Sequence, residues 1–96
     1  MLVQPNSIIT DGNLTLRGYH QLTSLASAVD VPGSGRILFL IPETQAVRIR
    51  DDGTDPTATI GFLIPVGMCF KYNGDPSALR VIETAVSATL NILAYN

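Results

Sequence analysis

Short turn motifs recur along the chain and divide it into segments of similar length. The motifs combine glycine, proline, asparagine and aspartate, which suit tight turns through backbone freedom, a fixed φ angle or a side chain that bonds nearby backbone. The segments between them are as long as strands and mostly too short for helices. This spacing predicts an all-β fold, a small β-sandwich or jelly-roll-like barrel of about 7–8 short antiparallel strands. The motifs are Asp11-Gly12-Asn13, Pro32-Gly33-Ser34-Gly35, Asp51-Asp52-Gly53, Asp55-Pro56, Pro65-Val66-Gly67 and Asn73-Gly74-Asp75-Pro76.

The length of the chain allows one hydrophobic core. With 96 residues it is long enough for one domain and too short for two. We expect residues 1–96 to form that domain, with residues 1–12 as a candidate extended arm. A domain of this size buries only about 60% of the surface that its unfolded chain exposes. Since 46% of the residues are hydrophobic and 15% are charged, apolar surface is left over, which predicts a partner.

Several segments alternate between apolar and polar residues with the period of two that a half-buried strand shows. The pattern predicts that Leu16 points into the core. Near the C-terminus it places Leu90, Ile92 and Ala94 together on one face. The segments with this pattern are residues 14–17, 47–50, 68–72 and 90–95.

The segment Arg36-Ile37-Leu38-Phe39-Leu40-Ile41 is apolar on both faces. Such a strand is either central and covered on both sides, or it turns its outer face to another subunit. A single sandwich of this size has no further layer to cover the second face. We therefore expect a subunit contact there.

Two stretches fit more than one structure. Residues 77–93 follow Asp75-Pro76, which suits the start of an amphipathic helix. However, many of these residues are β-branched and favour a strand. Residues 19–31 are low in charge and fit either one short helix or a bent strand, and we expect an extended strand that ends at Pro32.

The charge pattern argues against nucleic acid and membrane as partners. The net charge is -2, and the six basic residues are scattered along the chain, whereas phosphate binding needs a clustered positive surface. No apolar run approaches the roughly 20 residues that a membrane span requires. The N-terminus lacks the basic and apolar regions of a signal peptide. We expect a soluble protein made in a cytoplasm.

No catalytic centre or cofactor site is evident. The only histidine, His20, and the only cysteine, Cys69, lie far apart in the sequence, and a nucleophile pair between them has no support from spacing. We expect Cys69 to be a small core residue and His20 to lie at the surface. The prediction is a protein that is not an enzyme.

The densest acidic segment lies directly after a charged strand. Asp51, Asp52 and Asp55 offer oxygen atoms of the kind that calcium binds. Their spacing differs from an EF-hand loop, and no acidic residue follows at the bidentate position. A tight turn whose carboxylates pair with nearby arginines explains the segment better. Calcium binding stays a weak hypothesis on these three residues, and we predict no metal site.

Three segments together resemble small virion proteins of tailed bacteriophages. They are AVRIRDDGTDPTATIG, YNGDPSALRVIE and SATLNILAY, and the resemblance is most specific in DDGTDPTAT. It covers about half of the chain, from Ala46 onward with gaps. The resemblance implies a β-sandwich or jelly-roll module similar to head decoration (cement) proteins, which often act as trimers at capsomer junctions. It also implies that Val81-Ile82 lies in a strand.

The expected function is therefore that of a phage virion structural protein that decorates and stabilises the head as a homotrimer. Its partners would be copies of itself and the major capsid protein or another virion protein, and it would reside in virions assembled in the host cytoplasm. A tail, neck or fibre component and a glycan-binding module are the alternatives, with Tyr19 and Tyr72 as the aromatic candidates for the latter. The candidate interface consists of Phe39, Ile41 and Phe62 as subunit or core contacts and of Arg48, Arg50, Asp51, Asp52 and Asp55 as a polar docking edge.

Overall fold

Eight strands form two four-stranded antiparallel sheets, which confirms the all-β prediction. The computed structural model describes residues 16–32 and 36–96. The predicted arm at residues 1–12 lies outside the described residues. The elements are β1 (Leu16–Leu22), β2 (Val29–Asp30), β3 (Ile37–Glu43), β4 (Val47–Arg50), β5 (Phe62–Ile64), β6 (Phe70–Tyr72), a 3-10 turn η1 (Pro76–Ala78), β7 (Arg80–Glu83) and β8 (Thr89–Tyr95).

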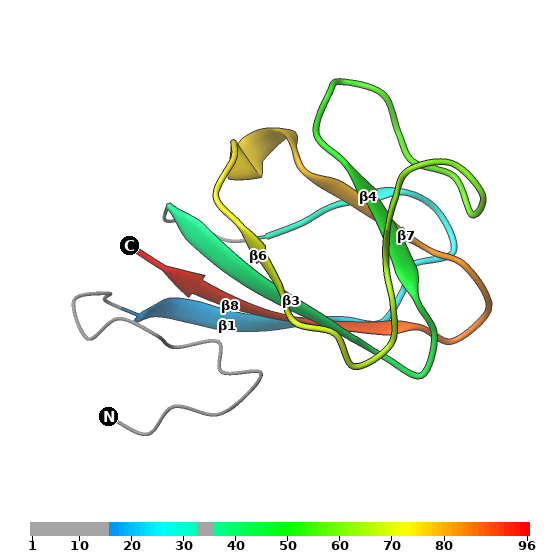
Figure 1. The fold of residues 1–96 in the computed structure, drawn as a ribbon, viewed down its shortest axis with the longest axis horizontal. Coiled ribbons are helices and arrows are strands. Elements are labelled where there is room, and N and C mark those ends of the chain that lie inside the picture. Colours follow the sequence, from blue (N-terminus) through cyan, green and yellow to red (C-terminus); the bar gives the residue numbers. More distant parts are fainter. Residues whose placement is uncertain (1–15, 33–35) are drawn as a thin grey trace.

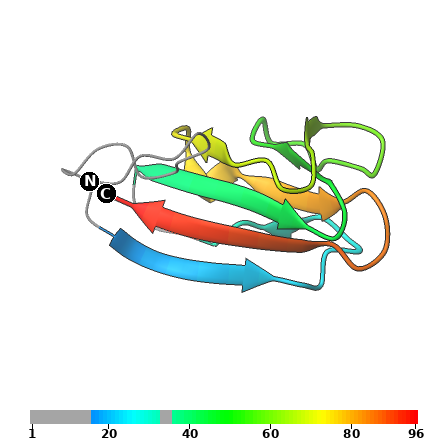
Figure 2. The ribbon, with the colours of Figure 1, turned by 60° about the horizontal axis from the view of Figure 1, so that its bottom comes forward.

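The strand order is that of a jelly roll. One sheet, sheet A, has the order β1-β8-β3-β6, and the other, sheet B, has the order β2-β7-β4-β5. The chain passes from one sheet to the other at almost every connection, and only β4 and β5 follow each other within a sheet. Figures 1 and 2 show β1, β8 and β3 side by side in sheet A, with sheet B packed against it. An eight-stranded double sheet of this kind is a jelly roll.

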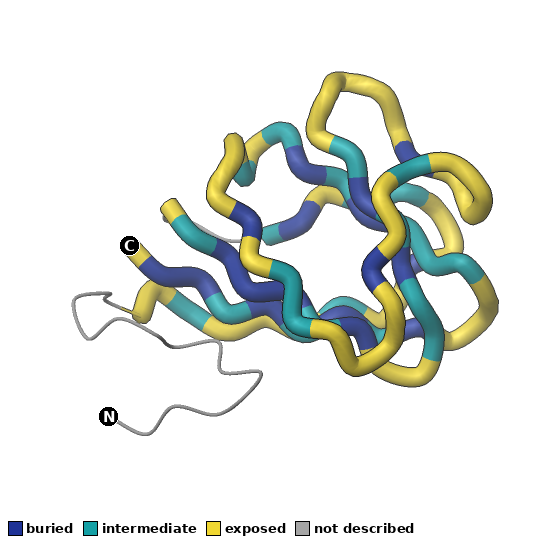
Figure 3. The backbone as a smooth tube through the Cα atoms, viewed as in Figure 1, coloured by how far each residue is buried: buried dark blue, intermediate teal, exposed yellow. Residues whose placement is uncertain are grey.

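The core lies between the sheets and depends on the alternation within β3 and β8. Leu38 pairs with Ala94 and Leu40 with Ile92 in the antiparallel register, and all four side chains are buried. The predicted inward face of residues 90–95 is thus confirmed. Figure 3 shows that buried residues follow the strands of both sheets, whereas most connections are exposed.

The outer face of β3 is covered in part by the chain itself. β3 is an inner strand of sheet A, between β8 and β6. The outward ring of Phe39 packs edge to face on Tyr95, with 5.6 Å between the ring centroids, and Phe39 is only 5% exposed. Ile37 and Ile41 on the same face are half-buried. Phe39 is therefore covered without a second subunit, and a contact through Ile41 stays a prediction.

The expected single strand that ends at Pro32 is wrong. β1 ends at Leu22 and belongs to sheet A, whereas β2 belongs to sheet B. Between them the chain crosses the sandwich and buries Leu25, whose carbonyl oxygen accepts a hydrogen bond from the Glu83 N–H. One continuous strand is incompatible with this crossing, since its two halves pair with different sheets.

Residues 77–93 contain β7 and the start of β8 instead of an amphipathic helix, and Val81-Ile82 lies in β7, as the resemblance implied. The helix-start signal at Asp75-Pro76 produces only the 3-10 turn η1, which has three residues. The side chain of Asp75 caps η1 by accepting bonds from Ser77 N and Oγ, which lower the pKa of Asp75. The chain then enters β7 at Arg80, because its β-branched residues fit a pleated surface better than a helix.

Two smaller predictions about side-chain direction are wrong. Leu16 is 56% exposed, because β1 is an edge strand with an irregular register between Leu16 and Gly18. In residues 68–72 the period of two predicts Met68, Phe70 and Tyr72 on one inward face. Phe70 and Tyr72 do point inward, whereas Met68 precedes β6 and is exposed. Among the described residues, no helix is long and apolar enough to cross a membrane.

The entry into β5 requires a glycine. Gly61 has a φ of 137°, and a Cβ atom there would lie 3.2 Å from the backbone oxygen of Ile49 and 3.1 Å from the Cβ of Pro56. Both contacts are tighter than ordinary van der Waals contacts, and that φ is almost restricted to glycine.

We expect Gly61→Ala to lower the free energy of unfolding by about 2–3 kcal/mol. Gly53→Ala is the matched control, because Gly53 also has a positive φ of 86° but has open space around it. Its cost should be about 1 kcal/mol. Urea denaturation of the two variants measures the difference, and equal losses would contradict the role given to the contacts around Gly61.

Candidate functional site

An apolar slot, here called the inter-sheet slot, opens between the sheets where β4 and β5 face β6. Its volume is about 200 Å³. Phe62 on β5 meets Phe70 on β6 with 5.0 Å between the ring centroids, so two aromatic rings bridge the sheets at this end of the core. The lining is mainly hydrocarbon, and its charged groups are the side chains of Arg50 and Asp51. The slot is lined by Ile49, Arg50, Asp51, Phe62, Phe70, Tyr72 and Leu79.

The long connection between β4 and β5 is held by Arg48. Its Nε donates to the carbonyl oxygen of Ala58 at 3.1 Å, and one terminal nitrogen donates to that of Gly61 at 2.8 Å. These bonds satisfy backbone groups that no strand partner reaches. Arg48 therefore positions the chain that leads into β5, and its guanidinium is engaged within the molecule.

The other arginines of this region, Arg50 and Arg80, form ion pairs with carboxylates of the same connection and of β2. Arg50 makes a two-point contact with Asp52 at 2.5 and 3.0 Å. Arg80 on β7 lies 2.7 Å from Asp30 and 3.1 Å from Asp55. The carboxylates raise the pKa of both guanidiniums, mainly through the hydrogen bonds that Asp52 accepts from Arg50 and Asp30 accepts from Arg80. These exposed pairs fix geometry more than they add stability.

Asp51 has a partner of a different kind. It accepts a hydrogen bond of 2.7 Å from the Tyr72 hydroxyl, which also lies 2.9 Å from the carbonyl oxygen of Asp75. Gly74 packs directly on the ring of Tyr72. Burial, together with the neighbouring carboxylate of Asp51, raises the pKa of Tyr72 well above its usual range. The contact ties β6 to the end of β4.

Exposed apolar side chains concentrate on one short segment, here called the apolar strip. Five large apolar residues within nine positions are 43–57% exposed. They lie on β5, which is an edge strand of sheet B, and on the chain before and after it. An edge strand also presents unpaired backbone groups. The strip consists of Ile60, Phe62, Leu63, Val66 and Met68.

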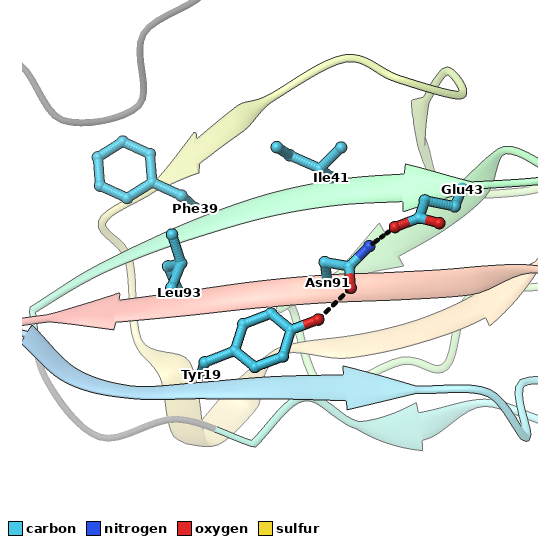
Figure 4. A pocket seen from close by; sticks show the side chains of 6 residues that line it. All are labelled: Tyr19, Phe39, Ile41, Glu43, Asn91 and Leu93. Carbon is cyan, nitrogen blue, oxygen red and sulfur yellow. Dashed lines mark hydrogen bonds between the residues drawn. The ribbon is translucent and has the colours of Figure 1, made fainter. Parts of the chain in front are cut away.

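A second hollow, here called the outer-face depression, lies on the side of sheet A that faces away from sheet B. It has a volume of about 340 Å³ and is built by three neighbouring strands, β1, β8 and β3. Figure 4 shows Phe39 and Leu93 at one end, and the amide of Asn91 and the carboxylate of Glu43 at the other. It is lined by Tyr19, Phe39, Ile41, Glu43, Asn91 and Leu93.

Asn91 organises the polar end of the depression. Its Oδ1 accepts hydrogen bonds from the Tyr19 hydroxyl at 2.5 Å and from Gln21 Nε2 at 3.1 Å. Its Nδ2 donates to Glu43 Oε1. The network therefore joins β1, β8 and β3 through side chains and holds the ring of Tyr19 along the sheet (Figure 4).

The predicted interface residues divide between these surfaces. Phe62, Arg50 and Asp51 meet at the inter-sheet slot, whereas Phe39 and Ile41 line the outer-face depression. The remaining three form internal contacts beside the slot. The five charged residues of the predicted docking edge thus already have partners within the chain. Their role in docking stays a prediction. The three are Arg48, Asp52 and Asp55.

The sequence does not single out Asn91, Glu43 or Phe70. Asn91 sits alone among apolar neighbours on an outward position of β8, and a polar residue in that place is the one signal that points to it. Glu43 reaches Asn91 only through the pairing of β3 with β8. That pairing joins residues 48 positions apart in the sequence.

The described residues hold no arrangement that matches a metal site or a catalytic pair. No group of three histidine, cysteine, aspartate or glutamate side chains within residues 16–32 and 36–96 is placed to bind a metal. Exposed His20 lies on β1 and Cys69 just before β6, and the two strands are opposite edges of sheet A. Cys69 is half-buried, which raises its pKa.

The comparisons with known proteins identify no relative: no family model, no curated protein and no solved structure matches the chain.

The Tyr72 contact predicts a specific loss of stability at high pH. An unfolded tyrosine ionises near pH 10, whereas folded Tyr72 keeps its proton to higher pH. Because the unfolded state then binds fewer protons, the free energy of unfolding falls as the pH rises above about 10. We expect Tyr72→Phe to cost about 1–2 kcal/mol at neutral pH and to reduce this alkaline decline.

Urea denaturation between about pH 8 and pH 11 measures both effects. Tyr19→Phe is the control, because it removes an exposed phenol that lies outside the slot. An alkaline decline that is equally steep in Tyr72→Phe and in the unchanged protein would refute the assignment to Tyr72.

Proposed function

We propose that this chain is a structural protein of a tailed-bacteriophage virion, a decoration protein that binds the outside of the head and stabilises it as a homotrimer. The observation that carries the proposal is the apolar strip, which leaves five large side chains half-exposed on and around an edge strand. The resemblance of the DDGTDPTAT segment to small virion proteins supports the same placement.

The fold is compatible with this role. Jelly rolls occur in viral capsid domains and also in lectins, so the fold alone selects neither function. A decoration protein needs a rigid body with a surface that remains apolar until it docks. The connection between β4 and β5, held by Arg48 and by two ion-paired carboxylates, presents the strip in a fixed geometry.

Docking through the strip would combine two interactions. Burying the exposed half of one such side chain contributes about 1 kcal/mol, and the free edge of β5 can add a strand from a partner. One contact of this size remains weak once the cost of association is included. Many copies arranged by the symmetry of a shell raise the effective concentration of the next contact, so weak individual contacts are sufficient.

The copy number in purified particles tests the placement. For a head decoration protein, quantitative mass spectrometry of gradient-purified virions should find on the order of hundreds of copies per particle. A few copies per particle would favour the alternative of a tail, neck or fibre component. Absence of the chain from virions would overturn the virion proposal altogether.

A paired set of variants tests the apolar strip. We expect Leu63→Asp/Met68→Asp to abolish self-association and binding to heads, because the two carboxylates lie where apolar surface would be buried. Val86→Asp is the control: it places the same charge on an apolar residue that is 78% exposed, on the connection between β7 and β8. Light scattering measures the oligomer, and sedimentation with heads measures binding.

The outcome is clear in either direction. A trimer in the unchanged protein and in Val86→Asp, with monomers in the double variant, supports docking through the strip. A strict monomer of the unchanged protein at high concentration removes the trimer. Equal head binding by both variants removes the strip as the docking surface, provided that circular dichroism shows both to be folded.

A further inference from the structure

The geometry points to a saccharide-binding site in the outer-face depression, selective for neutral sugars. The site is independent of the apolar strip, because it is built on sheet A from β1, β3 and β8. Its elements are an aromatic ring held along the sheet, an apolar floor and hydrogen-bonding groups at one end (Figure 4). Small-molecule sites have this composition, with a mainly apolar lining and a few placed polar groups.

The ring of Tyr19 is the platform. It is 55% exposed, yet its hydroxyl is fixed by Asn91, which in turn contacts Gln21 and Glu43. An exposed aromatic ring with a fixed orientation loses little conformational freedom when a ligand packs on it. The C–H face of a pyranose ring is flat and apolar and matches such a platform, as aromatic faces suit apolar partners.

The polar end matches the hydroxyl groups of a sugar. One oxygen of Glu43 accepts from Asn91, and a carboxylate has further acceptor positions for hydroxyl donors. Bonds from a hydroxyl to a carboxylate are charge-assisted and therefore stronger than neutral ones. A hydrocarbon chain would leave these groups desolvated and unpaired, which costs binding energy.

The charge of the depression selects among sugars. Among the described residues that line the depression, Glu43 is charged, and no lysine or arginine is present. Lys71 on β6 pairs with Phe39, at the other end of the depression from Glu43. An anionic sugar that bonds to the polar end would bring its carboxylate or sulfate near Glu43 and be repelled there. The depression therefore favours neutral hexoses and their oligomers over uronic or sialic acids.

The backbone around the depression argues against an extended peptide. β8 pairs with β1 and β3, and β3 pairs with β8 and β6, so the main chain of both central strands is already bonded on each side. A peptide gains affinity on a sheet chiefly through main-chain hydrogen bonds at a free edge. Over these two strands recognition must come from side chains, which fits a compact ligand with many hydroxyl groups.

Titration of the full chain with a sugar panel tests the inference. The panel contains neutral oligomers of glucose, galactose, mannose and N-acetylglucosamine, anionic oligomers of galacturonic acid, and decanoate as an acyl chain. Calorimetry and NMR chemical shifts are the readouts. We expect saturable binding of at least one neutral oligomer, with a Kd of roughly 0.1–10 mM, and shifts centred on Tyr19, Asn91 and Glu43.

Three variants locate the site. Tyr19→Ala should weaken binding by about tenfold or more, and Glu43→Gln, which keeps the shape, should weaken it and reduce the discrimination against anionic sugars. Leu63→Asp/Met68→Asp is the control, since both residues lie outside the depression, and its sugar affinity should be unchanged. Conversely, Tyr19→Ala should retain docking to heads, so that failure of either proposal is seen separately.

Several outcomes would overturn the inference. No saturation by any neutral sugar removes the site, and equal affinity for anionic oligomers removes the role given to Glu43. Saturable binding of decanoate alone identifies a hydrocarbon site instead. Sugar binding that survives both Tyr19→Ala and Glu43→Gln places the ligand elsewhere on the molecule.

Discussion

The pairing of β3 with β8 is the interaction on which the remaining structure depends. Both strands have seven residues and pair from Ile37–Tyr95 to Glu43–Thr89. A shift by one residue would turn the inward side chains of one strand away from sheet B, either Leu38 and Leu40 or Leu90 and Ile92. Because β1 and β6 add to the free edges of this pair, their side-chain directions follow from the same register. The inner face becomes the core, and the outer face becomes the depression around Asn91.

Local signals predicted much of the fold because they act within a few residues. The turn motifs separate most of the observed strands, and the alternation in residues 90–95 correctly identifies the buried face. The pairing of strands could not be predicted, because in a jelly roll almost every connection leaves its sheet. Residues 19–31 show the consequence: the sequence predicts one strand there, whereas the partner changes from β8 for β1 to β7 for β2.

The two candidate surfaces differ in how far the sequence indicates them. The apolar strip lies within nine successive positions, so a surplus of hydrophobic residues already points to it, although Phe62 alone among its five members is predicted as an interface residue. The outer-face depression combines residues from β1, β3 and β8 that are up to 74 positions apart, as Tyr19 and Leu93 are. Such a site exists only after the register of sheet A is set. Asn91 has its three polar neighbours because the strands bring Tyr19, Gln21 and Glu43 to it.

The charged segment around Arg48 shows why a row of alternating charges is weak evidence for a binding edge. In the fold, each nearby arginine uses its donors on this chain: Arg48 on two carbonyl oxygens and Arg50 on Asp52. An exposed ion pair contributes about 0–1 kcal/mol, so these contacts matter mainly for the position of the connection to β5. The arginine contacts fix the connection between β4 and β5, and this connection leads into the exposed apolar side chains of the strip. The proposed docking on this side of the molecule would therefore depend on hydrophobic area, while the arginines hold the connection that carries it.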